Sequence, residues 1–346
     1  MDVHYDYNLA FKSISEKLKK KFLRKPNVSD AIDEYTALSK QLDSEESFSL
    51  SAACWQQVAK CYHSVGNVVS ESAALQNAAK NYLHSETATT IESNNITFNE
   101  DLLSVISTYD EAIKLHCDQN ERVLSAKLCL ELADILAVKY EKYFESIPYY
   151  ERAISLSVNS ESSQQLQVAL IQLKLAAIKV FTCDYLSALK IYTEITNSIS
   201  NMNLLSSSRS SSFRGSDLTG LNQIFAKPQG LSARLLTEAD ISKLLLLIYS
   251  NPTKLQPEQK QTLEVYSSFQ TLSNSAANYL PVICLNRNIF ILLQSFVMAC
   301  QSNDVKLLHT LQTELWPQLS DVQNYLLNMI IDQMVNSSYT DDLLSQ

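Results

Sequence analysis

Glycine is the residue type that most constrains the fold of this chain, because only 4 of the 346 residues are glycine. β-Hairpins, bulges and phosphate-binding loops depend on glycine where the backbone needs a positive φ or a close approach. The 7 prolines are also few, whereas 46% of the residues are apolar. Folds rich in β-sheet are therefore disfavoured, and the sequence predicts an all-α fold.

A repeated pattern predicts how the helices pack. A small residue followed one turn later by a large one lets two helices approach closely, as in the second helix of a tetratricopeptide hairpin. Four copies occur: Tyr185-x-x-Ala188-x-x-x-Tyr192-x-x-Ile195, Tyr143-x-x-Ser146-x-x-x-Tyr150-x-x-Ala153, Val123-x-x-Ala126-x-x-x-Leu130-x-x-Ala133 and Val68-x-x-Glu71-x-x-x-Leu75-x-x-Ala78. The pattern predicts a tetratricopeptide-like helical-repeat solenoid. Because the copies are irregularly spaced, we expect helices longer than those of standard repeats.

The composition changes in the middle of the chain. Seven serines lie between Ser206 and Ser216, and three of the four glycines follow within residues 215–230. Few apolar residues recur there, so burial cannot offset the entropy of ordering. We expect an N-terminal helical-repeat solenoid (1–203), a disordered serine-rich loop (204–232), a C-terminal helical part of the same solenoid (233–336) and a frayed acidic tail (337–346).

Helix boundaries follow from prolines and capping residues. Pro26 ends a first amphipathic helix that begins near Leu9, and Asn27 is expected to cap the next one with Asp30 as its capping-box partner. In the C-terminal part, prolines separate helices that we expect at 233–250, 256–272, 286–302, 303–315 and 319–336.

No pattern of residues predicts an active site. The chain has no glycine-rich phosphate loop, no pair of histidines at metal-binding spacing and no CxxC motif among its 7 cysteines. A net charge of −9 disfavours nucleic acid as a ligand, and the longest aliphatic runs are too short to cross a bilayer. We expect a soluble, reduced, cytosolic or nuclear protein that is not an enzyme and needs no metal or cofactor.

The two ends of the chain carry opposite charge. The first thirty residues hold seven bases against four acids, whereas residues 288–346 hold one base, Lys306, against six acids. Such residues either form solvated helix faces or dock on a partner or on anionic lipid. The expected partner-binding residues are Asp304, Glu314, Asp321 and Asp332 at the acidic end and Lys19, Lys20, Lys21, Arg24 and Lys25 at the basic end. In the serine-rich loop, Arg209-x-x-Ser212 resembles a site for basophilic kinases, which makes Ser212 an expected phosphorylation site.

Several stretches resemble the forty-kilodalton huntingtin-associated protein family, also called the factor VIII intron-encoded protein family. The most specific one is the run KLKKKFLRKPNV at 17–28, and others follow in order at 128–133, 184–189, 257–267, 292–299 and 311–317. The chain is similar to an invertebrate member, and its serine-rich loop departs from the proline-rich loop of the vertebrate ones.

The resemblance implies an architecture and a partner. It implies a helical solenoid resembling soluble NSF attachment proteins, in a one-to-one complex with huntingtin, which it stabilises between huntingtin's HEAT-repeat domains. It also implies a link to an endosomal Rab GTPase and early-endosome motility, with cytoplasmic, nuclear and early-endosome pools. The alternative is a membrane-trafficking adaptor of the NSF-attachment type whose basic N-terminal helix contacts lipid.

Overall fold

The computed structural model of the chain describes residues 7–19, 27–92, 99–158, 162–210, 228–252, 255–267 and 279–344, which are mainly helical. No β-strand occurs within these ranges, and the helices pack in adjacent pairs, which confirms the all-α, helical-repeat prediction. The helices form two compact units, Met1–Ile135 and Leu136–Gln346, called unit 1 and unit 2 below. Helices occupy both ends of the predicted serine-rich loop (204–232), since one helix continues to Ser210 and the next begins at Leu231. The rest of that division stays a prediction, because residues 211–227 lie outside the described ranges.

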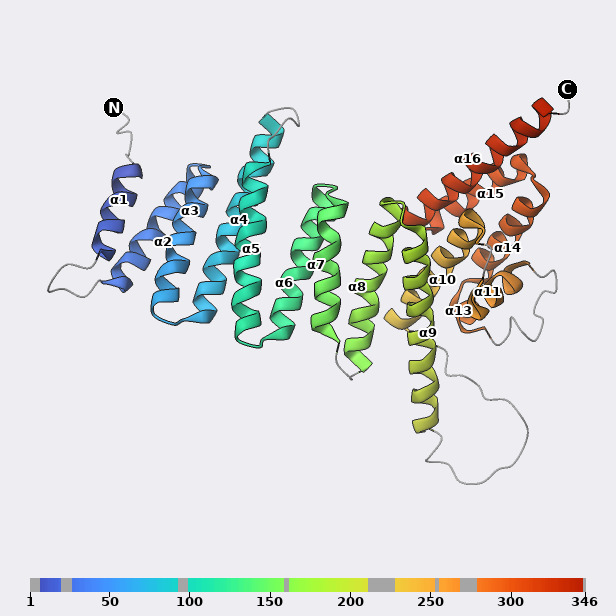
Figure 1. The fold of residues 1–346 in the computed structure, drawn as a ribbon, viewed down its shortest axis with the longest axis horizontal. Helices are drawn as coiled ribbons and strands as arrows, with labels where there is room; N and C mark the ends of the chain where they lie inside the picture. The colour runs from blue at the N-terminus through green and yellow to red at the C-terminus, as the bar shows by residue number, and fades with distance from the viewer. Residues whose placement is uncertain are drawn as a thin grey trace. The chain divides into compact units, whose positions relative to one another are not determined.

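Unit 1 is a row of helices in chain order (Figure 1). Its elements are α1 (Tyr7–Leu18), α2 (Val28–Ser44), α3 (Phe48–Ser64), α4 (Val68–Glu92), α5 (Glu100–Asp118) and α6 (Arg122–Asp134). Each helix packs chiefly against the one before it and the one after it. Small buried residues such as Ala31, Ala52, Ala78 and Ala112 lie along these interfaces, so neighbouring backbones approach closely. The packing of unit 1 is therefore local in sequence.

The same tight turn recurs between helices. A residue with φ between 53° and 73° donates its backbone N–H to the carbonyl three residues earlier, and the next residue donates to the carbonyl five residues earlier. This is the Schellman motif, in which glycine is the usual left-handed residue. Here the left-handed residues are Glu46, Gly66, Asn120, Cys183 and Asn303. Because other residues fill this position at four of the five turns, the fold needs very little glycine.

The turns fix the register of the repeat pattern. Copies of the pattern begin at the first residue of α4, of α7 (Tyr143–Ser157) and of α9 (Tyr185–Ser210). The copy placed at Val123 is wrong by one residue, because α6 begins at Arg122 and Val123 is 67% exposed. The equivalent buried positions of α6 are Ser125, Cys129 and Leu132.

The predicted cap of the second helix is also wrong. Asn27 precedes α2, but its side chain accepts no backbone hydrogen bond and instead donates to the carboxylate of Asp30. The exposed amide and carboxylate satisfy each other, so the predicted capping-box arrangement is not formed.

Unit 2 begins with hairpins and ends as a cluster around one helix. The π-helix η1 (Ile135–Lys139) leads into it. The remaining elements are α8 (Ser162–Phe181), α10 (Leu231–Ser250), α11 (Pro257–Ser267), α13 (Leu280–Cys284), α14 (Arg287–Ser302), α15 (Val305–Leu315), the 3-10 helix η3 (Trp316–Gln318) and α16 (Asp321–Leu344). The helices at 233–250, 286–302 and 303–315 are close to their predicted bounds, and α16 continues eight residues beyond the predicted end at 336.

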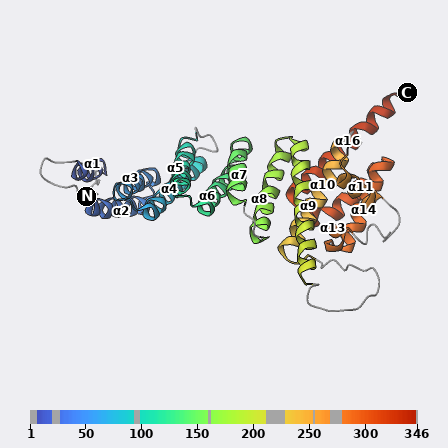
Figure 2. The ribbon, with the colours of Figure 1, turned by 60° about the horizontal axis from the view of Figure 1, so that its bottom comes forward.

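The central helix of unit 2 is α10. It contacts α8, α9, α11, α13 and α16, and Figures 1 and 2 show it among them. Every residue from Ala239 to Leu247 is buried, so this stretch of α10 has no solvent face. Its leucines join those of α14, α15 and α16 in a single apolar core. The prediction that the C-terminal half is helical is confirmed, and α10 supplies its centre.

Two charged residues of α10 lie inside this core. The Lys243 ammonium is 3.0 Å from a carboxylate oxygen of Asp240, and both side chains are almost completely buried. Tyr266 and Tyr279 donate to the two carboxylate oxygens at 3.1 and 2.6 Å. Burial and the Asp240 carboxylate raise the pKa of both phenols, which therefore stay protonated and donating. We call Asp240, Lys243, Tyr266 and Tyr279 the buried polar network.

Candidate interaction surface

The four acids predicted to contact a partner are exposed on the last two long helices. Asp304 and Glu314 lie at the two ends of α15, and Asp321 and Asp332 lie on α16. The helices are antiparallel, because Gln312 bonds to Asn328 and the Asn324 amide donates to the Trp316 carbonyl at 3.1 Å. This pairing brings Glu314 near the start of α16 and Asp332 near the middle of α15. The structure thus gathers the acids on one hairpin, which we call the acidic hairpin.

Two of these acids also belong to helix starts. The Asp304 carboxylate caps α15 by accepting the N–H of Leu307 at 3.1 Å. Asp321 is the first residue of α16, where a negative charge interacts favourably with the helix dipole. Glu314 and Asp332 are away from helix starts, so their charge can be changed with the least effect on the fold.

The basic N-terminal residues are only partly described. Lys19 is exposed just after α1, whereas Lys20, Lys21, Arg24 and Lys25 lie outside the described ranges, as does Ser212. On α1 itself, the Lys17 ammonium is 2.6 Å from Glu34 of α2. Part of the basic charge of this helix is therefore paired within the chain.

Apolar residues are exposed next to the helix turns. The second residue of a helix points into solvent in four cases, with exposures between 67% and 76%. These residues are Val69 and Val123 in unit 1 and Phe144 and Leu186 in unit 2. Single exposed apolar residues are common on protein surfaces, whereas those that lie close to other apolar side chains mark an interaction site.

The apolar surface of unit 2 is rich in aromatic rings. Tyr143, the first residue of α7, stacks on Phe181 at the end of α8 with 5.4 Å between ring centroids. Phe181 also lies 5.3 Å from the ring of Tyr325 on α16. We call these three residues, together with Phe144 and Leu186, the aromatic edge. Partly exposed tyrosine and phenylalanine are enriched where proteins bind one another.

A charged cluster connects the helices that carry the aromatic edge. The Lys179 ammonium lies 3.9 Å from Glu151 on α7 and 3.5 Å from Asp184 in the α8–α9 turn. Partial burial acts to raise the pKa of Asp184, but hydrogen bonds from Ser187 and the charge of Lys179 outweigh it, so the pKa is lowered. The cluster links α7, α8 and the α8–α9 turn, and these helices carry Tyr143 and Phe181 of the edge.

Within the described ranges, no group of histidine, cysteine and carboxylate side chains could hold a metal ion. Burial raises the pKa of Cys300 to about 12, and burial together with Asp43 raises that of Cys54 to about 12, so these thiols are poor nucleophiles. Over the same parts of the chain, no helix is both long and apolar enough to cross a bilayer.

Sequence reasoning missed the aromatic edge. The residues after each turn were assigned to the packing pattern, and that pattern says nothing of the second helical residue. A usable signal does exist, because a polar residue before the helix is followed two positions later by a large apolar one. It occurs at Asn67 and Val69, Lys142 and Phe144, and Asp184 and Leu186.

Comparisons with known proteins agree with this architecture. The chain is 29% identical to the 40-kDa huntingtin-associated protein of Mus musculus over 368 aligned positions, which cover 96% of this chain and 94% of the relative. It is 28% identical to the Rattus norvegicus protein of the same name, with the same coverage. The resemblance inferred from the run at 17–28 and the later stretches is confirmed. The profile of the family described as soluble NSF attachment protein, SNAP, matches residues 13–222, which is 210 of the 346 residues. The chain therefore belongs to the soluble NSF attachment protein family.

Proposed function

We propose that this chain is a non-catalytic subunit that binds and stabilises huntingtin and works in membrane traffic. The observation that carries the proposal is the similarity to two relatives named for their association with huntingtin, which extends over 96% of this chain and 94% of each relative. Because the similarity extends over both units and not only over the repeat pattern, it favours a partner in common with these relatives. Membership of the attachment protein family supports the role in traffic.

The exposed surfaces support a large protein partner. The aromatic edge offers rings for a desolvated contact, and the acidic hairpin offers charge that attracts a basic surface and speeds association. We propose a one-to-one complex in which the chain lies between the HEAT-repeat domains of huntingtin. The basic residues near Lys19 are a further proposed contact.

Purification of the tagged chain from its own cells at physiological salt tests the proposal. A single partner of very high mass, identified as huntingtin and present in a one-to-one ratio, is the expected result. Recovery of vesicle proteins alone, in less than stoichiometric amounts, would contradict it.

The aromatic edge is tested with a pair of matched double variants. Phe144→Ser with Leu186→Ser removes the two most exposed apolar side chains of the edge, and each is exposed enough to change without opening the core. We expect an affinity loss of about tenfold or more, or about 1.4 kcal/mol. Val69→Ser with Val123→Ser changes the equivalent positions of unit 1 and is the control, for which we expect a change below threefold.

Charge changes on the acidic hairpin test the electrostatic contact. Glu314→Gln with Asp332→Asn removes two charges and leaves the Asp304 cap intact. Slower association at low salt and a weaker salt dependence are expected, because exposed charges act mainly on the association rate. An unchanged rate and salt slope would mean that the hairpin only keeps the chain in solution.

The proposed cellular role is in early-endosome traffic. We propose that the complex is linked to an endosomal Rab GTPase and to early-endosome motility, with cytoplasmic, nuclear and early-endosome pools. The alternative is an adaptor whose basic N-terminal helix contacts lipid, and it is favoured by the family match, which starts at residue 13 within α1. Flotation of the purified chain with anionic liposomes distinguishes the two, since only the adaptor is expected to float without a protein partner.

A further inference from the structure

The first helix, α1, is less buried than the other helices of unit 1. Only Ile14 of its 12 residues is buried, whereas five residues of the next helix, α2, are buried. Leu9, an apolar residue of α1, is 65% exposed. The rest of unit 1 therefore covers only a small part of the α1 surface.

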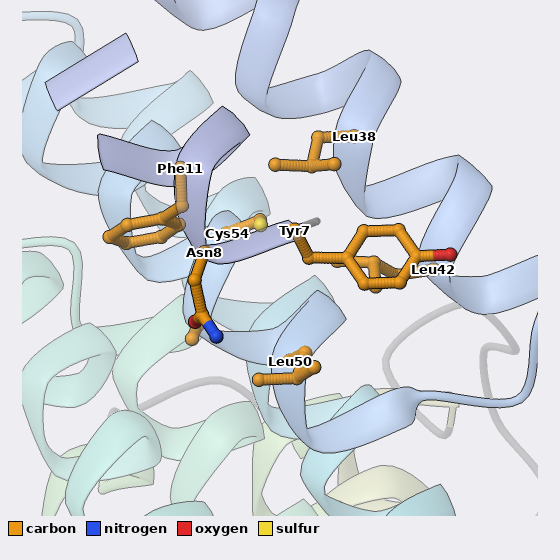
Figure 3. Close-up of a pocket in the computed structure, with 8 residues that line it drawn as sticks. Tyr7, Asn8, Phe11, Leu38, Leu42, Leu50 and Cys54 are labelled. Carbon is orange, nitrogen blue, oxygen red and sulfur yellow. The ribbon is translucent and has the colours of Figure 1, made fainter. Parts of the chain in front are cut away.

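An open pocket lies where α1 meets α2 and α3. Its volume is about 190 Å³, and Figure 3 shows Phe11 of α1, Leu38 of α2 and the Cys54 thiol of α3 among the side chains that line it. Side chains beside an unfilled space lose part of the dispersion energy that close packing would give them. The contact of α1 with its neighbours is therefore weaker than a close-packed helix interface.

A second pocket lies between α1 and α2. Its volume is about 340 Å³, and it is lined by Ala10 and Ile14 of α1 and by Ala37 and Leu38 of α2, among others. Ile14, the one buried residue of α1, thus lies beside unfilled space, and Leu38 lines both pockets. The packing of α1 on α2 is incomplete in two places.

The contacts between α1 and α2 include polar ones that are easily broken. The Lys17 ammonium is 2.6 Å from Glu34, but both side chains are partly exposed, so salt screens this pair. The Tyr35 hydroxyl donates to the Phe11 carbonyl at 3.4 Å, which is long for such a bond, and the two rings meet edge to face at 5.2 Å. Elements with few buried contacts open while the rest of a domain stays folded.

We propose that α1 detaches from unit 1 as one helix while α2 to α6 stay folded. Detachment exposes Tyr35, Leu38 and Cys54, which are almost fully buried when α1 is in place. It also moves Lys19, a proposed partner contact that directly follows α1. The helix thus controls whether the apolar face of α2 and α3 is exposed. This conformational change belongs to unit 1 alone and does not depend on the proposed partner.

The reaction of Cys54 with N-ethylmaleimide, followed by mass spectrometry of the purified full chain, measures detachment. Cys129 on α6 is the reference thiol, because it is fully buried in the same unit. Each rate is divided by the rate of the same thiol in the denatured chain. We expect Cys54 to react at least about tenfold faster than Cys129, and the amides of α1 to exchange hydrogen faster than those of α2. Equal rates for the two thiols, or equal exchange in the two helices, would overturn the proposal.

Three variants connect the thiol reaction to α1. Ile14→Ala removes the one buried side chain of the helix and should speed the reaction of Cys54 at least about tenfold, with no change at Cys129. Leu9→Ala makes a similar truncation at an exposed position of the same helix and is the matched control, for which we expect a change below twofold. Ala37→Leu fills part of the second pocket and should slow the reaction of Cys54 about threefold.

The ion pair provides a test that leaves the core unchanged. Glu34→Gln should speed the reaction of Cys54 about two- to threefold in roughly 0.05 M salt and leave it unchanged in roughly 0.5 M salt, where the pair is already screened. Asp33→Asn neutralises an exposed acid of the same helix and is the control, with no change expected. Should Ile14→Ala fail to fold, an unchanged rate in Glu34→Gln at low salt would overturn the proposal.

Discussion

Units 1 and 2 are built from similar helices but are held together in different ways. In unit 1 each helix packs against its neighbours in the chain, and small residues such as Ala52 and Ala78 line the interfaces. In unit 2, α10 is enclosed by helices from distant parts of the sequence, and one apolar core extends from α8 to α16. The comparison teaches that a single chain can combine a repeat-like half, whose stability is local, with a half that has one shared core.

This difference has a thermodynamic consequence. In a row of repeats, the unfolding free energy is close to a sum of contributions from each repeat and from each interface between neighbours. A destabilising mutation in one helix therefore affects few other helices. In a shared core, a change at the central helix affects every element that contacts it. Mutations in the two units should therefore cause similar losses of stability, but the number of helices that each mutation affects should differ.

The largest effect is expected at the buried polar network of unit 2. Lys243→Met removes the cation and leaves the Asp240 carboxylate buried without its charge partner. We expect a loss of about 3–5 kcal/mol in the unfolding free energy of unit 2, measured by denaturant unfolding. Replacing both charged residues, with Lys243→Met and Asp240→Leu, should restore part of the loss. A single variant within about 1 kcal/mol of the parent would mean that α10 is not the centre of stability.

A matched pair of core truncations compares the two units directly. Leu132→Ala on α6 and Leu244→Ala on α10 each remove a fully buried side chain and should each cost about 2–5 kcal/mol. Hydrogen exchange should show faster opening only around α5 and α6 in the first variant and throughout α8 to α16 in the second. Opening that spreads equally far in both variants would remove the distinction between the units.

The sequence predicts the helix hairpins better than the core around α10 for the same reason. The repeat pattern reflects contacts between residues close in the chain, so the buried Ala188, Tyr192 and Ile195 of α9 could be recognised by spacing alone. Asp240 and Lys243 would be assigned to a solvated face by the same reasoning. Their partners Tyr266 and Tyr279 come from other segments, so no local sequence pattern predicts these contacts.

The candidate surfaces show the same limit. The sequence could count the acids near the C-terminus but could not tell that Asp304 is a helix cap while Glu314 is a plain surface charge. The aromatic edge depends on contacts between α7, α8 and α16, and the pocket of unit 1 depends on how much of α2 and α3 the first helix leaves open. Such features follow from packing and not from any one segment.

The Asp304 cap should have a moderate and local effect. Asp304→Ala removes the side-chain acceptor for the Leu307 N–H and should cost about 1 kcal/mol of the stability of unit 2. Asp304→Asn keeps an acceptor and should cost far less, which makes it the control in thermal unfolding. A similar loss in both variants would mean that the charge of Asp304, and not its hydrogen bond, stabilises the start of α15.

The smallest effect is expected at the tight turns, where the two units are alike. Gly66 in unit 1 and Cys183 in unit 2 occupy the same left-handed position, with φ of 73° and 61°, and a Cβ added at Gly66 would meet no atom within 4 Å. A side chain is unfavourable in this backbone region, so Gly66→Ala should destabilise and Cys183→Gly should stabilise by about 0.5–1 kcal/mol. Denaturant unfolding measures both changes. Equal and opposite values would mean that the turn contributes the same unfolding free energy in both units. The burial of α10 would then be the source of the difference in stability between the units. A much larger effect in unit 2 would instead mean that its turns are strained by the shared core.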